Sequence, residues 1–430
     1  MKLKLILFIA FSFVSSLVVS GQSKLKAIKA GKMIDVVNGK VLENQIILIN
    51  NNIIVDVGPS VIIPPGTEII DLSNSVVLPG LIDCHTHLTG QPSGDYYGDK
   101  FRKTTLDFAI IAHLYAKKTL EAGFTSCRDV GSSEFLDIAL RNAINEGQIP
   151  GPRLQVATMP IGSTGSHIDF NGFSPYLDWK ISKQMSGIAD GLDEVQKQVR
   201  YNIKYGADII KLIAGAGVLS EEESAGAPQY SQEEMNAIVA EATRWGKKTC
   251  AHAHGTETIK MAIMAGVASV EHGSLIDEEG LQLMKKKGTY LIPTIYVGEY
   301  VVKEFPAMGF PQKIIDKAKE ISSAASVSFS NAVKEGVKIA YGTDAAVFPH
   351  GDNAKQFVLM VKYGMTPMAA IQSATMNAAD LLGWKEKTGS LTKGKFADII
   401  AVAVDPLDDI STLEHVTFVM KDGIVYKNSK

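Results

Sequence analysis

The chain has few cysteines, little net charge and only one long hydrophobic run, and each shortage excludes a class of protein. Its 3 cysteines among 430 residues are too few, and odd in number, for a disulfide scaffold. Lysine and arginine (43) nearly balance aspartate and glutamate (46), so the formal net charge of -3 points to neither a nucleic-acid partner nor an electrostatic membrane anchor. With 46% hydrophobic residues the chain is neither disordered nor collagen-like. What remains is a folded, enzyme-sized protein.

The one long hydrophobic run lies at the N-terminus. Lys2 and Lys4 precede the apolar residues 5–19, and the small residues Ser20 and Gly21 follow. This order predicts a signal peptide over residues 1–21, export to the periplasm or the medium, and no membrane association after cleavage. The run is shorter than the about 20 residues that a spanning helix needs, and an uncleaved N-terminal anchor is the alternative.

Beyond this segment the hydrophobic pattern changes twice. Residues 22–79 and 385–430 contain short β-like runs separated by turn signals. Residues 80–384 instead alternate eight short apolar runs with longer segments of helical periodicity, several of which end in glycine. This alternation predicts an α/β fold with a parallel (β/α)8 barrel, the TIM barrel. Because chain termini commonly lie close together, we expect the flanking segments to form one small composite β-sandwich domain.

Ionisable residues gather at the C-terminal ends of the predicted barrel strands, where the active sites of such barrels are built. They are His85, His87, Lys211, His252, His254, His272 and Asp344. Side chains i and i+2 of a strand point the same way, so His85 and His87 can bind one ion. Imidazole and carboxylate together suit a divalent metal such as zinc. A lone histidine at a strand end is more often a packing residue, but the whole set at one rim favours a metal site.

Two basic residues lie inside apolar strands and need an explanation. A buried ammonium group such as that of Lys211 is costly unless it is neutralised or paired, and the structural alternative is a salt bridge to Asp208 or Asp344. For Arg128 we expect a structural pair with Asp129, the alternative being contact with a substrate carboxylate.

Taken together, these motifs resemble the amidohydrolase superfamily, and most closely its imidazolonepropionase-like branch, which includes metal-dependent Xaa-Pro and Xaa-Arg dipeptidases. The resemblance rests on VVLPGLIDCHTHL, the lysine of IIKL, AHAHG, VEHGS and GTDA, and TSCRDVG and GSLTKGKFADIIAV extend it over nearly the whole mature chain. HxH alone is a weak signal. HxH followed by Lys, His, His and Asp at barrel spacing is a specific one.

The resemblance implies a binuclear metal site with six ligands: His85, His87, Lys211, His252, His272 and Asp344. The first two histidines and the aspartate would hold the more buried ion, and the other two histidines the second. A carboxylated Lys211 would bridge two divalent cations, zinc in the first place, with manganese and cobalt as alternatives. A hydroxide shared by the ions would attack an amide or ester carbonyl, because a bound metal lowers the pKa of water to about 7. Asp344 would serve as general base and then as general acid.

Three further residues are candidates for substrate binding. His167 lies in the loop GSTGSHID, where it either contacts the substrate or ties the loop together. Tyr230 resembles the tyrosine with which dipeptidases of this branch hold the scissile carbonyl; alternatively it is an apolar residue ahead of the helix cap Ser231. His254 points the same way as His252, which we take as the ligand, and it would orient the substrate or support the site.

The expected function is hydrolysis of a carbon–nitrogen bond in a small molecule, a dipeptide or an N-acyl amino acid. One alternative is a mononuclear imidazolonepropionase-like cyclic amidohydrolase or deaminase, which Lys211 disfavours because those enzymes lack the lysine of the fourth strand. A lactone or ester hydrolase is a second alternative, since the same hydroxide attacks either carbonyl. A non-catalytic barrel is disfavoured by the complete ligand set. A homo-oligomer is compatible with the sequence.

Overall fold

A computed structural model describes residues 25–91, 93, 95–169, 171, 174, 176, 183–220 and 224–429. The expected signal peptide, residues 1–21, lies outside them. Among the residues described, no helix combines the length and the apolar character needed to cross a bilayer.

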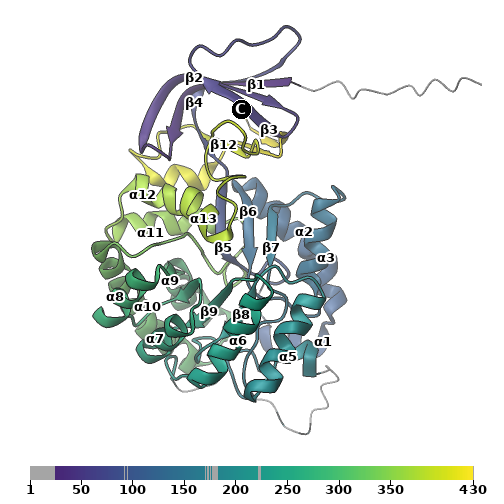
Figure 1. Ribbon diagram of the computed structural model, residues 1–430, viewed down its shortest axis with the longest axis vertical. Helices are drawn as coiled ribbons and strands as arrows, with labels where there is room; N and C mark the ends of the chain where they lie inside the picture. Colours follow the sequence, from purple (N-terminus) through teal and green to yellow (C-terminus); the bar gives the residue numbers. More distant parts are fainter. Residues whose placement is uncertain are drawn as a thin grey trace, which may run out of the picture.

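Strands from both ends of the chain form one seven-stranded sheet, which lies above the larger body of the molecule (Figure 1). Its order is β14-β13-β12-β4-β1-β2-β3. The strands are β1 (Leu25–Asp35), β2 (Lys40–Asn50), β3 (Ile53–Gly58), β4 (Glu68–Pro79), β12 (Ile399–Val402), β13 (Phe418–Lys421) and β14 (Ile424–Asn428). The two ends meet where β12 pairs antiparallel with β4, with Ile400 opposite Leu78. Alternating apolar residues give the sheet its own core, which includes Ile28, Ile47 and Phe418.

The larger body contains two parallel sheets of order β5-β6-β7 and β11-β10-β9-β8. Their strands are β5 (Leu81–Thr86), β6 (Phe124–Asp129), β7 (Arg153–Val156), β8 (Ile210–Ile213), β9 (Thr249–Ala253), β10 (Ser269–His272) and β11 (Tyr290–Ile292). Most of their residues are buried, as expected for parallel strands covered on both faces. Single parallel bridges continue the pairing from Ile161 to Leu212, from Leu291 to Ile339 and from Thr86 to Ala345. The predicted α/β class is confirmed, with mixed sheets.

Helices surround the parallel strands (Figure 1). They are α1 (Tyr96–Arg102), α2 (Thr105–Glu121), α3 (Leu136–Asn145), α4 (Lys183–Ser186), α5 (Gly191–Lys204), α6 (Gln232–Arg244), α7 (Thr256–Ala265), α8 (Glu278–Lys287), α9 (Ile295–Glu304), α10 (Gln312–Glu335), α11 (Gln356–Lys362), α12 (Pro367–Gln372) and α13 (Ala378–Leu382). Short turns of other helix types are η1 (Phe305–Met308), η2 (Asn353–Lys355), η3 (Ser373–Asn377) and η4 (Ile410–His415).

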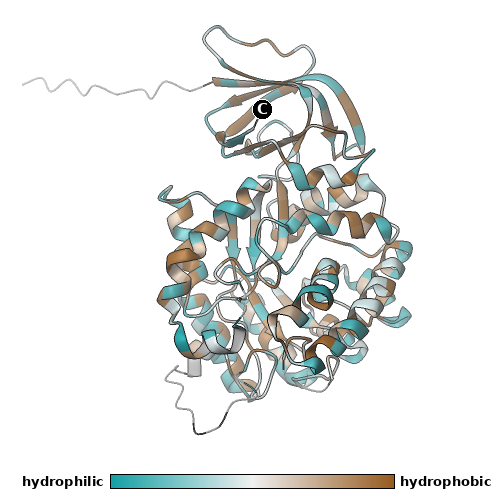
Figure 2. Ribbon diagram, turned by 180° about the vertical axis from the view of Figure 1, so that it is seen from behind, coloured by the Kyte–Doolittle hydropathy of each residue, from teal (hydrophilic) through white to brown (hydrophobic). Residues whose placement is uncertain are grey.

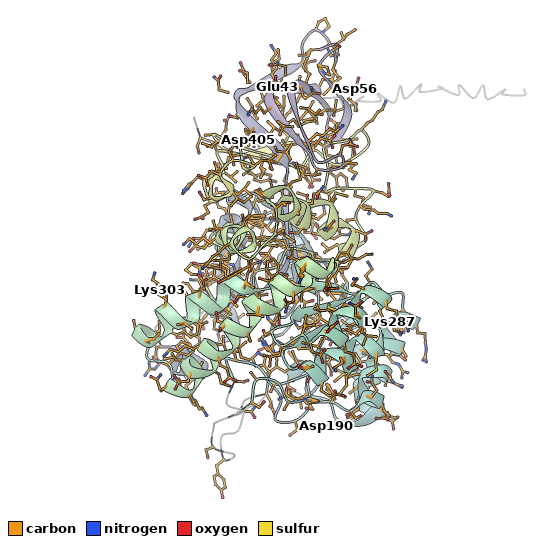
Figure 3. All side chains as sticks on the ribbon, turned by 90° about the vertical axis from the view of Figure 1, so that its left-hand side faces the viewer. Glu43, Asp56, Asp190, Lys287, Lys303 and Asp405 are labelled. Carbon is orange, nitrogen blue, oxygen red and sulfur yellow. The ribbon has the colours of Figure 1, made fainter. Side chains whose placement is uncertain are left out.

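Local signals begin and end these helices, and their amphipathic faces orient them. Ser231 caps α6 by accepting a hydrogen bond from the Glu234 backbone N–H in a capping box, and Gly288 ends α8 in the left-handed conformation. Hydrophilic stripes run along the outer faces of the helices (Figure 2). Charged side chains such as Lys287 and Lys303 point outward (Figure 3). The apolar faces of the helices pack against the strands. The candidate ionisable residues lie at the carboxyl ends of these strands.

Candidate metal centre

The first group of candidate ligands comes from β5, the residues just after it, and the segment that follows Ile339. His85 Nε2 lies 3.5 Å from Asp344 Oδ1, and His87 Nε2 lies 3.4 Å from the same oxygen. One ligand atom from each of the three residues falls within 4.8 Å of the others. The two histidines share a side of the chain, as the strand periodicity predicts. These three residues are therefore close enough to share one ion.

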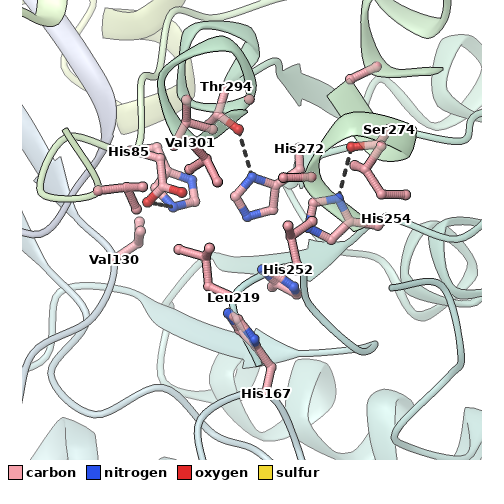
Figure 4. Close-up of a pocket in the computed structure, with 18 of the residues that line it drawn as sticks. His85, Val130, His167, Leu219, His252, His254, His272, Ser274, Thr294 and Val301 are labelled. Carbon is pink, nitrogen blue, oxygen red and sulfur yellow. Dashed lines mark hydrogen bonds and ion pairs between the residues drawn. The ribbon is translucent and has the colours of Figure 1, made fainter. Parts of the chain in front are cut away.

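The second group consists of His252 on β9, His272 at the end of β10, and His254. Their ligand atoms also lie within 4.8 Å of one another. His272 Nδ1 is hydrogen-bonded to Thr294 Oγ1 at 2.7 Å, and His254 Nδ1 to Ser274 Oγ at 2.8 Å (Figure 4). Each of these bonds fixes one ring nitrogen and leaves Nε2 for a ligand. The geometry thus groups His254 with the two expected ligands, a point that the sequence pattern left open.

Lys211, on β8, lines the same cavity as both groups. Its side chain is 3% exposed and makes no hydrogen bond or ion pair with any residue that the structure describes. The alternative of a salt bridge to Asp208 is wrong, because that carboxylate pairs with Arg141 at 2.7 Å, and no ion pair joins Lys211 to Asp344 either. Burial lowers the pKa of Lys211, although Glu271 and Asp344 favour its charged form. The amine is therefore buried, unpaired and biased toward its neutral state.

The pKa shifts favour the metal-binding form of His85, His254 and Asp344. His87 differs: burial lowers its pKa, but the hydrogen bond to Asp344 and the charge of that carboxylate outweigh burial and raise it. Burial, together with the charge of Lys211, lowers the pKa of His85 to about 4, and burial lowers that of His254 to about 3. Burial favours the protonated acid of Asp344, but His85 and His87 outweigh it and hold the pKa of this carboxyl below its usual range. Neutral imidazoles and an ionised carboxylate are the forms that bind cations.

One buried atom tests whether this donor set fits a metal. His252 Nε2 has no hydrogen-bond partner among the described residues. An unsatisfied buried polar group costs about 1–3 kcal/mol, so such an atom needs a partner from outside the protein. Imidazoles and a carboxylate arranged around it are the donors that zinc and similar divalent cations take. The residues present therefore fit a divalent metal.

Residues 76–427 match the model of the amidohydrolase family. The chain belongs to this family. Ochratoxinase of Aspergillus niger is 34% identical over 436 aligned positions, which cover 94% of this chain and 87% of that protein. The crystal structure of a Xaa-Pro dipeptidase with methionine bound in its active site is 42% identical, with a TM-score of 0.90 over 94% of this chain and all 100% of that one. Imidazolonepropionase of Thermoplasma acidophilum is 23% identical over 398 positions, which cover 87% of this chain and 86% of that protein.

These relatives confirm the resemblance that the motifs indicated. This amidohydrolase is a hydrolase that acts on carbon–nitrogen bonds, and its relatives include enzymes for amide and peptide substrates of small size. The family is generally metal-dependent, which agrees with the two groups of potential ligands.

A buried ion pair supports the first group of ligands in this amidohydrolase. Glu271 Oε2 lies 2.7 Å from His85 Nδ1, and Arg128 Nη2 donates to Glu271 Oε1 at 2.7 Å. The expected pair of Arg128 with Asp129 is wrong, because Asp129 accepts hydrogen bonds from the backbone N–H groups of Leu88 and Gly131 instead. Burial opposes ionisation of Glu271, but Arg128 and His85 lower its pKa to about 2. Sequence reasoning missed Glu271; the available signal was a carboxylate directly before the candidate ligand His272 in a short predicted strand.

Two of the three candidates for substrate binding line the cavity, and the third does not. His167 lines the cavity, stacks on His252 with ring centroids 4.5 Å apart, and has Nδ1 2.8 Å from Ser220 Oγ. His254 also lines the cavity. Tyr230 is not among the lining residues; it is buried, and its hydroxyl donates to the Ala189 carbonyl oxygen at 2.8 Å. Its contact with substrate stays a prediction.

Proposed function

We propose that this amidohydrolase uses two divalent cations and a carboxylated Lys211 to hydrolyse the amide bond of a dipeptide or an N-acyl amino acid. The observation that carries the proposal is the buried, unpaired amine of Lys211 beside two groups of ligands. A neutral amine adds carbon dioxide and releases a proton, which gives a carbamate. Protonated lysine carries an ammonium group, which repels metal ions. The carbamate instead offers two oxygens with negative charge, which bind them. Zinc is the proposed native metal, and manganese and cobalt accept the same ligands.

In this proposal His85, His87 and Asp344 hold one ion, and His252 and His272 hold the other. When bound, the ions supply a hydroxide at neutral pH and polarise the substrate carbonyl. The protein then contributes the proton transfers and the orientation. Asp344, whose pKa lies below its usual range, would take the proton from the nucleophile and deliver it to the leaving nitrogen.

The side chains around this centre hold it ready for catalysis. Glu271 fixes the ring of His85 through Nδ1, so that Nε2 faces Asp344. His167 and His254 are proposed to contact the substrate. His254 also lies beside His252 and His272, close enough to be a direct ligand of the second metal ion. The lysine weighs against the mononuclear alternative, because one ion needs no bridging ligand.

The closed barrel, the composite β-domain and export of the protein are also part of this proposal. The bridges at Ile161, Ile339 and Ala345 support a closed (β/α)8 barrel over residues 80–384, in which the segment around 339–345 is the eighth strand. The seven-stranded sheet supports one composite β-domain from residues 22–79 and 385–430, and its expected form, a β-sandwich, stays part of the proposal. Export to the periplasm or the medium rests on residues 1–21 alone.

The test combines metal analysis with a substrate screen. Zinc-loaded protein should contain two ions per chain and hydrolyse members of a library of dipeptides and N-acyl amino acids. Lys211→Ala should lose at least one ion and about 10²-fold or more in kcat/KM, and small carboxylates that fill the vacated space should restore part of the activity. Protein exposed to ¹³C-bicarbonate should show a carbamate signal that Lys211→Ala lacks. The exposed Lys287→Ala is the matched control and should behave as the parent protein. Two ions and undiminished turnover in Lys211→Ala would contradict the bridging role.

A further inference from the structure

The cavity at the metal centre has two chemically different parts. Its ionisable lining residues are the five candidate histidine ligands, His167, Lys211 and Asp344, which lie on the strand ends and adjoining loops. A separate wall is contributed by α9 and α10, including Gly298 and Val301 from the first helix and Ala318 from the second. Figure 4 shows Val301 and Leu219 beside the imidazole cluster. The substrate therefore meets polar groups on one side and an apolar surface on another.

The part of the wall that α10 contributes is one helix face, and the residues of this face are small or apolar. Ala318, Ile321, Ser322 and Ala325 follow the spacing i, i+3, i+4, i+7, which places them on the same side of α10. The helices approach closely here, because a Cβ on Gly298 of α9 would lie 2.6 Å from Ser322 Oγ. Because the side chains along this face of α10 are short, they leave space in the cavity that longer side chains would occupy.

An apolar cluster supports the wall from behind. Val301 and Ala318 pack with Phe305, Phe310 and Ile314, and the two phenylalanine rings stack with centroids 4.1 Å apart. No acidic or basic side chain of α9 or α10 lines the cavity in the part of the chain that the structure describes. Lys317, next to Ala318, donates instead to the carbonyl oxygens of Gly217 and Ser220. A charged group entering from the substrate would thus find no counter-charge at this wall.

We infer that the wall formed by α9 and α10 is the specificity pocket of this enzyme, and that it accepts an uncharged apolar side chain of the substrate, such as that of leucine, methionine or phenylalanine. The inference rests on the proposed function, whose substrates carry such a side chain next to the scissile amide. Each buried methylene is worth about 0.8 kcal/mol, which predicts about a 4-fold gain in affinity per methylene until the pocket is full. An unpaired charge in the same place is expected to lower affinity by at least about 100-fold.

The test measures binding as well as turnover, so that the two proposals fail separately. The probes are dipeptide analogues in which a phosphinate replaces the scissile amide, which imitates the tetrahedral transition state. One series varies the residue on the acyl side through alanine, leucine, methionine, phenylalanine, lysine and aspartate, and a second series varies the residue on the amine side. Calorimetry with zinc-loaded protein gives each Kd, and the corresponding dipeptides give kcat/KM. One of the two series should rank by apolar size and reject lysine and aspartate.

Two pairs of variants locate the effect on the wall. Ala325→Met should weaken the phenylalanine and methionine analogues at least about 10-fold more than the alanine analogue, whereas Val327→Met, on the exposed side of the same helix, should change none of the three. Ser322→Asp should improve the lysine analogue about 10-fold and weaken the leucine analogue, whereas the exposed Ser323→Asp should do neither.

Each outcome decides one proposal or the other. Ranked binding without any hydrolysis would support the pocket and refute the proposed reaction. Equal affinities in both series or a preference for charged side chains would overturn the pocket. No measurable binding by any analogue would overturn the pocket and the proposed metal centre together, whereas hydrolysis of the dipeptides would still support the reaction. A ranking that Ala325→Met and Ser322→Asp leave untouched would also overturn it, because the selecting surface would then lie elsewhere.

Discussion

Replacing Glu271 by glutamine should both destabilise the fold and weaken binding at the proposed metal centre. Glu271 is 0% exposed and Arg128 is 3% exposed, so the substitution leaves a buried guanidinium without its counter-charge. Breaking a buried pair in this way costs about 3–5 kcal/mol of unfolding free energy. Volume is almost unchanged, so packing adds little to this figure.

The same substitution should reverse the hydrogen bond to His85. In the parent protein Arg128 and Ser269 both donate hydrogen bonds to Oε1 of Glu271. We expect the side-chain oxygen of the glutamine to accept the same two bonds. Its amide N–H2 then faces His85 Nδ1 and makes that nitrogen an acceptor. The proton moves to Nε2, the nitrogen that faces Asp344, and the ligand lone pair is lost. Metal affinity should fall about 10–100-fold, as it does when partners of a metal ligand are removed.

Urea unfolding in the presence of a chelator isolates the effect on the fold, and competition with a zinc indicator measures metal affinity. The matched control is Glu335→Gln. Glu335 pairs with Lys285, and because the two side chains are 36% and 39% exposed, the change should cost no more than about 1 kcal/mol. The double variant Arg128→Met/Glu271→Gln should be more stable than the sum of the two single changes. A loss below about 1 kcal/mol for Glu271→Gln, with unchanged zinc affinity, would refute this reasoning.

Two other predictions concern carboxylates with shifted pKa values. Asp344→Asn should lower kcat by about 10²–10⁴-fold in metal-loaded protein, because the proton acceptor is gone; a kcat within 5-fold of the parent at equal metal content would exclude its role as base. Burial, and then the charge of Asp129, raises the pKa of Asp137 from 3.8 to about 7. Its contribution to stability is therefore full below about pH 4 and is lost as the pH rises through about 7. Asp137→Asn should flatten the fall in urea midpoint between pH 5 and pH 8, and an unchanged slope would contradict the assignment.

The parts of the site that could be predicted from sequence are those governed by short-range rules. His85 and His87 share a side because strand side chains alternate, and the remaining candidates gather because parallel strands end at the same edge of a sheet. Strand ends alone therefore predict that these residues gather at one rim. Their division into two groups of candidate ligands came from the family resemblance and from the geometry. The burial of Lys211 follows in the same way from the apolar strand around it.

What could not be predicted depends on contacts between distant segments. Arg128 reaches Glu271 across 143 positions of sequence, and nothing near either residue distinguishes this partner from the adjacent Asp129. The apolar pocket likewise needs the packing of α9 against α10, which a periodicity in each helix does not specify. The backbone at His272 and Asp344 could not be predicted either, because their φ angles are positive, 70° at His272 and 64° at Asp344. Residues other than glycine adopt that conformation only when their surroundings impose it, at a cost of about 1–3 kcal/mol. The alternation rule therefore stops being valid at the end of β10 and at Asp344, and the direction of each side chain there is set by contacts with distant segments.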